Sequence, residues 1–276
     1  MASSQHLVVA SVVLLLMATC SSAYEGPLGY YCNKNSGMAD GGPVAANINN
    51  LLAGWTQVFK GGARFIGSSY GTGENIVYGL AQCREDVDDK DCSECIEAAT
   101  QRIRDSCPDK PDAQIWYNSC LLTYSPDKFF GNIDTSNRVF TVPNYKDVDD
   151  PQALREALRI LFAVLIGDAI DANNRGFATG QVRLSESNTL YGMAQCTLDL
   201  SSCACAQCLD VATKHFEMYC GHSIGCRVFY SSCAVRYELG PFIHLPDGFH
   251  KIPGQAMEKS IIDRENKSSS LGRETL

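Results

Sequence analysis

The chain repeats itself at a fixed offset, and this duplication limits the possible folds more than any other feature of the sequence. Residues 78–83 read YGLAQC, and residues 191–196, 113 positions later, read YGMAQC. The same offset relates Cys83, Cys92, Cys95, Cys107, Cys120 and Tyr124 to Cys196, Cys205, Cys208, Cys220, Cys233 and Tyr237. So many matches at one offset indicate two copies of a single domain.

Each copy is predicted to begin with an amphipathic helix. The apolar positions follow the i, i+4, i+7, i+8 spacing of one helical face, and a proline stands near each predicted start, at Pro43 and Pro151. The two matching stripes are Val44, Ile48, Leu51, Leu52, Trp55, Phe59 and Leu154, Leu158, Leu161, Phe162, Leu165, Ala169. A core-packing role is favoured over ligand binding for this helix.

A second helix and then strands follow in each copy. Asp91 is predicted to cap the second helix, with Glu94 three residues later. Residues 115–124 then alternate, which predicts a strand with Trp116, Cys120, Leu122 and Tyr124 on one side. Two helices followed by strands indicate an α+β fold rather than an alternating α/β fold.

The N-terminus predicts export. Residues 7–18 form an apolar run that is too short to span a bilayer, and small residues precede a cleavage site after Ala23. The predicted organisation is therefore a signal peptide at 1–23, domains at 24–145 and 146–250 joined near residues 144–150, and a polar, disordered tail at 251–276. A buried N-terminal helix is the alternative for residues 1–23. Asn266 is a glycosylation acceptor in the tail, and the expected destination is the extracellular apoplast.

The cysteine content agrees with an oxidising compartment. The chain has 14 cysteines, and cleavage after Ala23 removes Cys20 and leaves an odd number. A C-x8-C-x2-C pattern occurs in both copies, and the pairs of C-x2-C raise zinc as an alternative. The local metal candidate is Cys203, Cys205 and Cys208 with His222, but a disulfide loop is favoured and no metal or cofactor is predicted.

Charge and motifs exclude several functions. The formal net charge is −8, and both predicted domains carry more acids than bases, so nucleic acid and anionic lipid are disfavoured. The chain has no G-x-S-x-G, H-E-x-x-H or P-loop motif, and its histidines stand in no recognisable acid–base motif. We therefore expect a protein that is not an enzyme, does not insert into a membrane, and binds an extracellular protein or a cell-wall glycan.

Three motifs resemble the plant cysteine-rich repeat proteins built on the ginkbilobin-type domain, which is also called the salt-stress/antifungal domain. These are the C-x8-C-x2-C pattern, residues 115–120 (IWYNSC) and residues 236–238 (RYE). The resemblance covers about residues 28–245 and implies, for each domain, two helices packed on a five-stranded antiparallel sheet. It also implies the disulfides Cys32–Cys107, Cys83–Cys92, Cys95–Cys120, Cys196–Cys205 and Cys208–Cys233.

The second domain departs from the family pattern in its cysteines. No residue before Cys196 matches Cys32, so Cys220 lacks its expected partner, and Cys203 and Cys226 are additional. Pairing of Cys220 with one of these two is favoured. The remaining cysteine, Cys203 or Cys226, would then be free or would link two molecules in a disulfide-bonded dimer.

The resemblance also implies a candidate sugar site. Family domains that bind mannose use an asparagine, an arginine and a glutamate, whose groups match the donors and acceptors of sugar hydroxyls. Asn33 matches in the first domain, where Gln114 and Ser125 replace the other two, and Arg227 and Glu238 match in the second. Neither domain holds all three.

Arg227 and Glu238 have opposite strand parity, so they share a face only if the strand bends or bulges near Cys233. The alternative is that these two residues form a structural ion pair and that Asn33 caps a turn. The favoured function is a secreted interaction protein of stress, defence or developmental signalling, and the alternative is a mannose- or cell-wall-glycan-binding antifungal lectin.

Overall fold

The computed structural model describes residues 25–37, 41–134, 139–185 and 188–243. The predicted signal peptide, the tail at 251–276 and the acceptor Asn266 lie outside these residues. No helix among the residues described is both long enough and apolar enough to cross a membrane.

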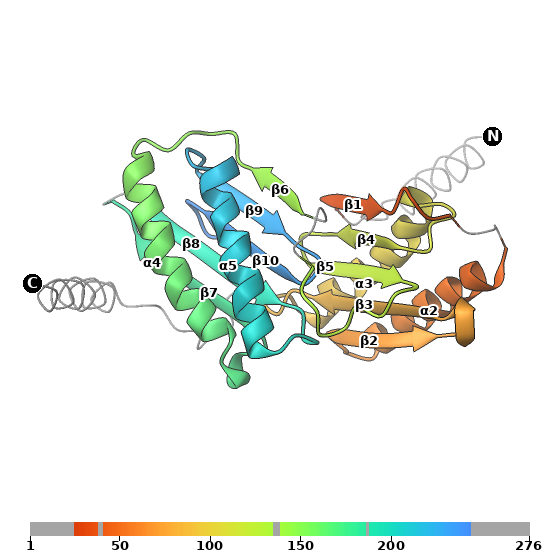
Figure 1. Cartoon of the computed structure of the whole chain (residues 1–276). Helices are drawn as coiled ribbons and strands as arrows, with labels where there is room; N and C mark the ends of the chain where they lie inside the picture. Colours follow the sequence, from red (N-terminus) through yellow and green to blue (C-terminus); the bar gives the residue numbers. More distant parts are fainter. Residues whose placement is uncertain (1–24, 38–40, 135–138, 186–187, 244–276) are drawn as a thin grey trace, which may run out of the picture.

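The chain folds into two α+β domains of the same architecture (Figure 1). The first contains β1 (Gly29–Cys32), α2 (Pro43–Lys60), β2 (Phe65–Tyr70), β3 (Val77–Cys83), α3 (Asp89–Ser106), β4 (Ala113–Trp116) and β5 (Cys120–Ser125). The second contains β6 (Phe140–Pro143), α4 (Pro151–Ala169), β7 (Phe177–Arg183), β8 (Thr189–Cys196), α5 (Ser202–Tyr219), β9 (Gly225–Phe229) and β10 (Cys233–Glu238). The antiparallel strand orders are β1-β4-β5-β3-β2 and β6-β9-β10-β8-β7, which confirms the predicted fold.

The repeated YG-x-AQC motif explains how a helix packs on each sheet. Gly79 of β3 lies under α2, where an added Cβ would stand 2.5 Å from the Trp55 ring. Gly192 occupies the same place under α4, with a Leu161 methyl at 2.8 Å from the Cβ position. Only glycine permits this close approach, so both copies require it and both bury the apolar stripe of the first helix.

The second helix begins earlier than the sequence predicts. Asp88, rather than Asp91, is the N-cap of α3, and its carboxylate accepts a hydrogen bond from the backbone N–H of Asp91 at 2.7 Å. Several acidic residues in succession offered equivalent caps, so composition could not choose among them. Two disulfides, Cys83–Cys92 and Cys95–Cys120, then hold α3 against β3 and β5.

The prediction of one face for Trp116, Leu122 and Tyr124 is wrong for Trp116. Residues 115–124 form a hairpin, with Ile115 opposite Leu122 and Trp116 opposite Leu121. The backbone N–H of Tyr117 donates to the oxygen of Cys120 at 2.8 Å, and the two-residue turn that remains reverses the parity. Leu122 and Tyr124 therefore enter the helix-covered core while Trp116 points to the other face.

The first strand of the second sheet precedes the expected domain boundary. Phe140–Pro143, which the sequence division at residue 145 places in the first domain, forms β6 and pairs with β9. Residues 144–150 therefore connect β6 to α4 within the second domain. The segment that joins the two sheets runs from the end of β5 to β6.

Candidate functional site: the seam between the two sheets

The two domains meet through the sheet surfaces that their own helices leave uncovered. In Figure 1 the helices of the two domains lie on opposite sides of their sheets, and the ends of β5 and β3 meet those of β10 and β8. We call this interface the seam. Its main residues are Gln82, Gln114, Trp116, Asn118, Leu121, Gln195, Phe229, Ser231, Ala234 and Arg236.

The glutamine of the repeated motif joins one copy to the other. Gln82 Nε2 donates to the backbone oxygen of Cys196 at 3.0 Å, and Gln195 Nε2 donates to that of Cys83 at 3.0 Å. Gln82 Oε1 also accepts from the backbone N–H of Leu198 at 2.9 Å. Both side chains are buried, so each needs such a partner. Because the two bonds are reciprocal, they relate the two domains by an approximate twofold axis.

An apolar cluster fills one side of the seam. Trp116 of the first domain packs with Phe229 and Ala234 of the second, and its ring stacks on that of Phe140 with the ring centroids 6.3 Å apart. The indole N–H of Trp116 donates to the backbone oxygen of Tyr230 at 3.2 Å. Trp116, which the sequence pattern had placed on the same face as Leu122, is thus a main apolar contact between the domains.

Two candidate sugar residues of the first domain have partners within the protein. Gln114 is wholly buried, and its Nε2 donates to the backbone oxygen of Ser231, in the second domain, at 3.3 Å. Asn33 Nδ2 donates to Asp112 Oδ2 at 3.0 Å, and Asn33 Oδ1 accepts from the backbone N–H of Asn35 at 3.0 Å. The asparagine therefore sits in an Asx turn, and the glutamine lies inside the seam.

The candidate sugar residues of the second domain form an ion pair beside the first domain. Glu238 Oε1 lies 3.5 Å from Arg227 Nε and 3.0 Å from Arg236 Nη2. Both arginines reach Asn118 Oδ1 of the first domain, at 3.4 Å and 3.3 Å. The carboxylate and the two guanidinium groups therefore serve one interdomain network.

Arg227 and Glu238 share a face through the hairpin turn between β9 and β10, rather than through a bend or bulge near Cys233. Register pairs Arg227 with Arg236, and Arg236 and Glu238 lie two residues apart on β10, so all three share a face. The turn between β9 and β10 reverses the parity, as it does for Trp116 in the first domain.

Arg236 is a seam residue that the search for a sugar site did not single out. It is buried, and its guanidinium carbon lies 3.9 Å from the centre of the Phe242 ring. Burial, together with the charge of Arg227, lowers the pKa of Arg236 to about 10. The side chain therefore remains charged at neutral pH, and Glu238 and Asn118 provide its partners. Its place in the RYE motif that carried the family resemblance was the available signal.

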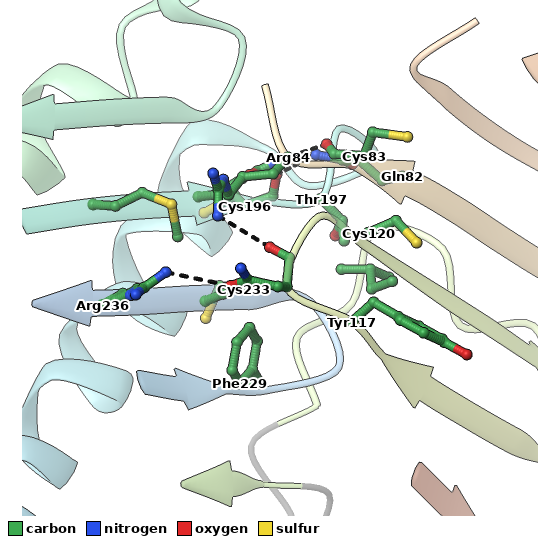
Figure 2. Close-up of a pocket in the computed structure, with 15 residues that line it drawn as sticks. Gln82, Cys83, Arg84, Tyr117, Cys120, Cys196, Thr197, Phe229, Cys233 and Arg236 are labelled. Atoms are coloured by element: carbon green, nitrogen blue, oxygen red, sulfur yellow. Dashed lines mark hydrogen bonds between the residues drawn. The ribbon is translucent and has the colours of Figure 1, made fainter. Parts of the chain in front are cut away.

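A small cavity lies in the middle of the seam (Figure 2). Arg84 of the first domain and Arg236 of the second both line it, and both donate to Asn118, Arg84 to the backbone oxygen at 3.1 Å and Arg236 to Oδ1 at 3.3 Å. The cavity volume is about 40 Å³, which holds one or two waters. Because small-molecule sites typically measure roughly 300–1,000 Å³, this cavity is too small for a sugar ring.

The cysteines of the described residues form six disulfides. They include the five pairs that the resemblance implies, and the sixth joins Cys220 to Cys226. Cys203 is exposed and is the free cysteine of the described part of the chain. Within that same part, no group of three His, Cys, Asp or Glu side chains could hold a metal ion.

Two histidines of the sequence search fall within the residues described. His215 of α5 shares a 3.0 Å hydrogen bond between its Nε2 and the Tyr230 hydroxyl, and Tyr219 packs against its ring. Burial lowers the pKa of His215 below its ordinary value. His222 is exposed.

Known proteins share both the sequence and the fold. The salt stress response/antifungal family model matches residues 31–127 and 143–240. Cysteine-rich repeat secretory protein 55 of Arabidopsis thaliana is 39% identical over 238 residues, covering 85% of this chain and 90% of that protein. The antimicrobial ginkbilobin-2-like protein of Castanea crenata is 38% identical, covering 88% of this chain and 99% of that protein.

A solved structure shows the same tandem arrangement of domains. The tandem DUF26 ectodomain of the Arabidopsis thaliana cysteine-rich receptor-like protein PDLP8 matches with a TM-score of 0.68 and 25% identity, over 78% of this chain and 98% of that one. The family model covers two segments that together make up more than half of the sequence. The chain therefore belongs to the salt stress response/antifungal family, as a tandem-domain protein related to the cysteine-rich repeat secretory proteins.

Proposed function

We propose that this protein is a non-catalytic interaction protein of the plant apoplast, acting in stress, defence or developmental signalling. The observation that carries the proposal is the use of Gln114, Arg227 and Glu238 within the seam. Gln114 and Arg227 bond to the opposite domain, and Glu238 pairs with Arg227 and Arg236 beside it, so these groups already have partners in place of sugar hydroxyls. An extracellular protein is then the favoured partner, which agrees with the secretory and receptor-like names of the relatives.

The alternative is a mannose- or cell-wall-glycan-binding antifungal lectin. It is supported by the antimicrobial name of the Castanea relative and by the match of Asn33, which is half-buried and lies outside the seam. A disulfide-linked dimer through Cys203 is compatible with either function, because its thiol is exposed. We also propose that Asn266 is glycosylated when the protein is secreted.

Calorimetric titration with mannose and with mannan separates the two functions. We expect no saturable heat from the mature protein, and the same result from Asn33→Ala and Arg227→Ala, because Asn33 and Arg227 already have partners within the chain. Galactan serves as the control polymer, and Lys34→Ala as the control variant next to Asn33. Tight mannan binding that Asn33→Ala or Arg227→Ala abolishes would establish the lectin instead.

A further inference from the structure

The helix α2 and the strand β2 of the first domain carry almost no charge. Between residues 41 and 73 the charged residues are Lys60 and Arg64. Lys60 pairs with Glu97 of α3 at 3.3 Å, and Arg64 is held by the backbone oxygens of residues 84, 85 and 87. We call the uncharged region the α2–β2 surface, and its main residues are Asn50, Gly54, Val58, Gly67, Ser69 and Tyr70.

The equivalent side of the second domain is charged. The exposed face of α4 carries Arg155, Glu156, Arg159 and Asp168, and β7 ends with Arg183. With a net charge of −8, two copies of the chain repel each other in most orientations. The α2–β2 surface is where this repulsion opposes a second copy least, because its charged residues, Lys60 and Arg64, are bases that are each paired with an acid of the first domain.

The strand β2 lies at the end of its sheet and offers one unpaired edge. Its register places Phe65 opposite Gln82, and the backbone N–H of Cys83 donates to the oxygen of Arg64 at 2.9 Å. Hydrogen-bonded pairs alternate in an antiparallel ladder, so Ile66 and Ser68 bond towards β3. The N–H and C=O groups of Phe65, Gly67 and Ser69 therefore point away from the sheet. The strand contains no proline and no charged residue, which are the features that usually protect an edge strand from pairing with another chain.

The helix α2 continues this surface beside the open edge. Trp55 Nε1 donates to Ser68 Oγ at 2.9 Å, which places α2 over β2. Because Lys60 reaches α3 on the other side of the helix, Gly54 and Val58 face the edge side. Val58 and Tyr70 are 43% and 45% exposed, so they are large apolar groups that the isolated chain leaves uncovered.

We propose that two copies of this chain associate through the α2–β2 surface, with β2 pairing antiparallel to its counterpart around a twofold axis at Gly67. In this register Gly67 of one chain lies opposite Gly67 of the other, and Phe65 of each chain lies opposite Ser69 of the other. The backbone N–H and C=O groups of all three residues point outward, so each donor of one strand meets an acceptor of the other in this register. The two α2 helices then lie side by side, and Gly54 lets them approach closely. This inference goes beyond the proposed function and does not depend on it.

Sedimentation analysis of the mature secreted protein tests the proposal, in a Cys203→Ser background that removes any disulfide-linked dimer. The weight-average mass should rise towards twice the chain mass as the concentration increases. Gly54→Arg should keep the mass at one chain, because the new side chain projects into the helix contact. No atom lies within 4 Å of a Cβ at Gly54, and arginine favours a helix more than glycine does, so this variant should fold.

A second variant and a matched control separate the interface from general effects. Ser69→Pro removes one outward N–H that the isolated chain does not use, and it should also abolish the dimer. Gly167→Arg places the same substitution on α4, again with no atom within 4 Å of the Cβ, and should dimerise like the parent. A parent protein that remains one chain at all concentrations, or a Gly54→Arg variant that dimerises equally well, would overturn the proposal.

Discussion

Gln114 and Arg227 illustrate how the same residue types can serve a ligand or the protein itself. An amide and a guanidinium suit sugar hydroxyls, but they suit a backbone oxygen and an amide oxygen equally well. In this chain the second kind of partner is present, at 3.3 Å for Gln114 and 3.4 Å for Arg227. Sequence could identify these residues as polar groups with a role. It could not tell which partner they meet, because that partner comes from the other copy.

His215 gives a prediction at the same scale. Burial lowers its pKa below the ordinary value, so the folded protein binds fewer protons at His215 than the unfolded chain does. The resulting loss of stability starts as the pH falls below the unfolded pKa of about 6.5 and is complete below the folded pKa. The melting temperature of the wild type should therefore fall more between pH 7 and pH 5 than that of His215→Asn. An equal or greater fall in His215→Asn would exclude this role.

The sequence predicted which segments form helices or strands better than it predicted the face of the sheet on which each side chain lies. The apolar stripes located α2 and α4 correctly, because a helix keeps one period from end to end. The sequence pattern placed Trp116 on the wrong face and expected a bend or bulge where the β9–β10 hairpin brings Glu238 beside Arg227, because each turn reverses the parity of the next strand. The register of an antiparallel pair is set by the turn geometry, which alternation within one strand does not reveal.

The disulfides that hold the ends of α3 and α5 should contribute unequally. Cys32–Cys107 spans 75 residues and ties β1 to the end of α3, whereas Cys220–Cys226 spans 6 residues. On the chain-entropy model the long loop stabilises by about 4 kcal/mol and the short one by about 2 kcal/mol. Urea unfolding of the two double Cys→Ser variants should therefore show the greater loss for Cys32 and Cys107. Equal losses would show that loop length does not govern these bonds.

At the scale of the whole molecule, the tandem arrangement was predicted but the seam was not. The constant offset showed two domains, and the repeated glutamine was visible in both. Nothing in local patterning shows that Gln82 and Gln195 each bind the other copy, since such contacts depend on how two folded sheets dock. The assignment of β6 to the second sheet was missed for a similar reason, because pairing with β9 joins residues about 85 positions apart.

The seam also predicts that the two domains unfold together. Buried apolar contacts at Trp116 and the reciprocal glutamine bonds stabilise each domain only while the other is folded. Gln114→Glu places a carboxylate against the Ser231 oxygen inside the seam, where it cannot donate and where burial opposes its charge. Gln101→Glu makes the same change on the exposed face of α3 and serves as the control.

Scanning calorimetry of these proteins at neutral and acidic pH tests most directly whether the candidate sugar residues hold the domains together. The wild type and Gln101→Glu should each melt in one transition. Gln114→Glu should melt lower and in two transitions at neutral pH, and should recover in part at acidic pH, where the protonated carboxyl can donate. If Gln114→Glu instead melts like the wild type at neutral pH, then Gln114 is not in the seam, and its position is free for a ligand.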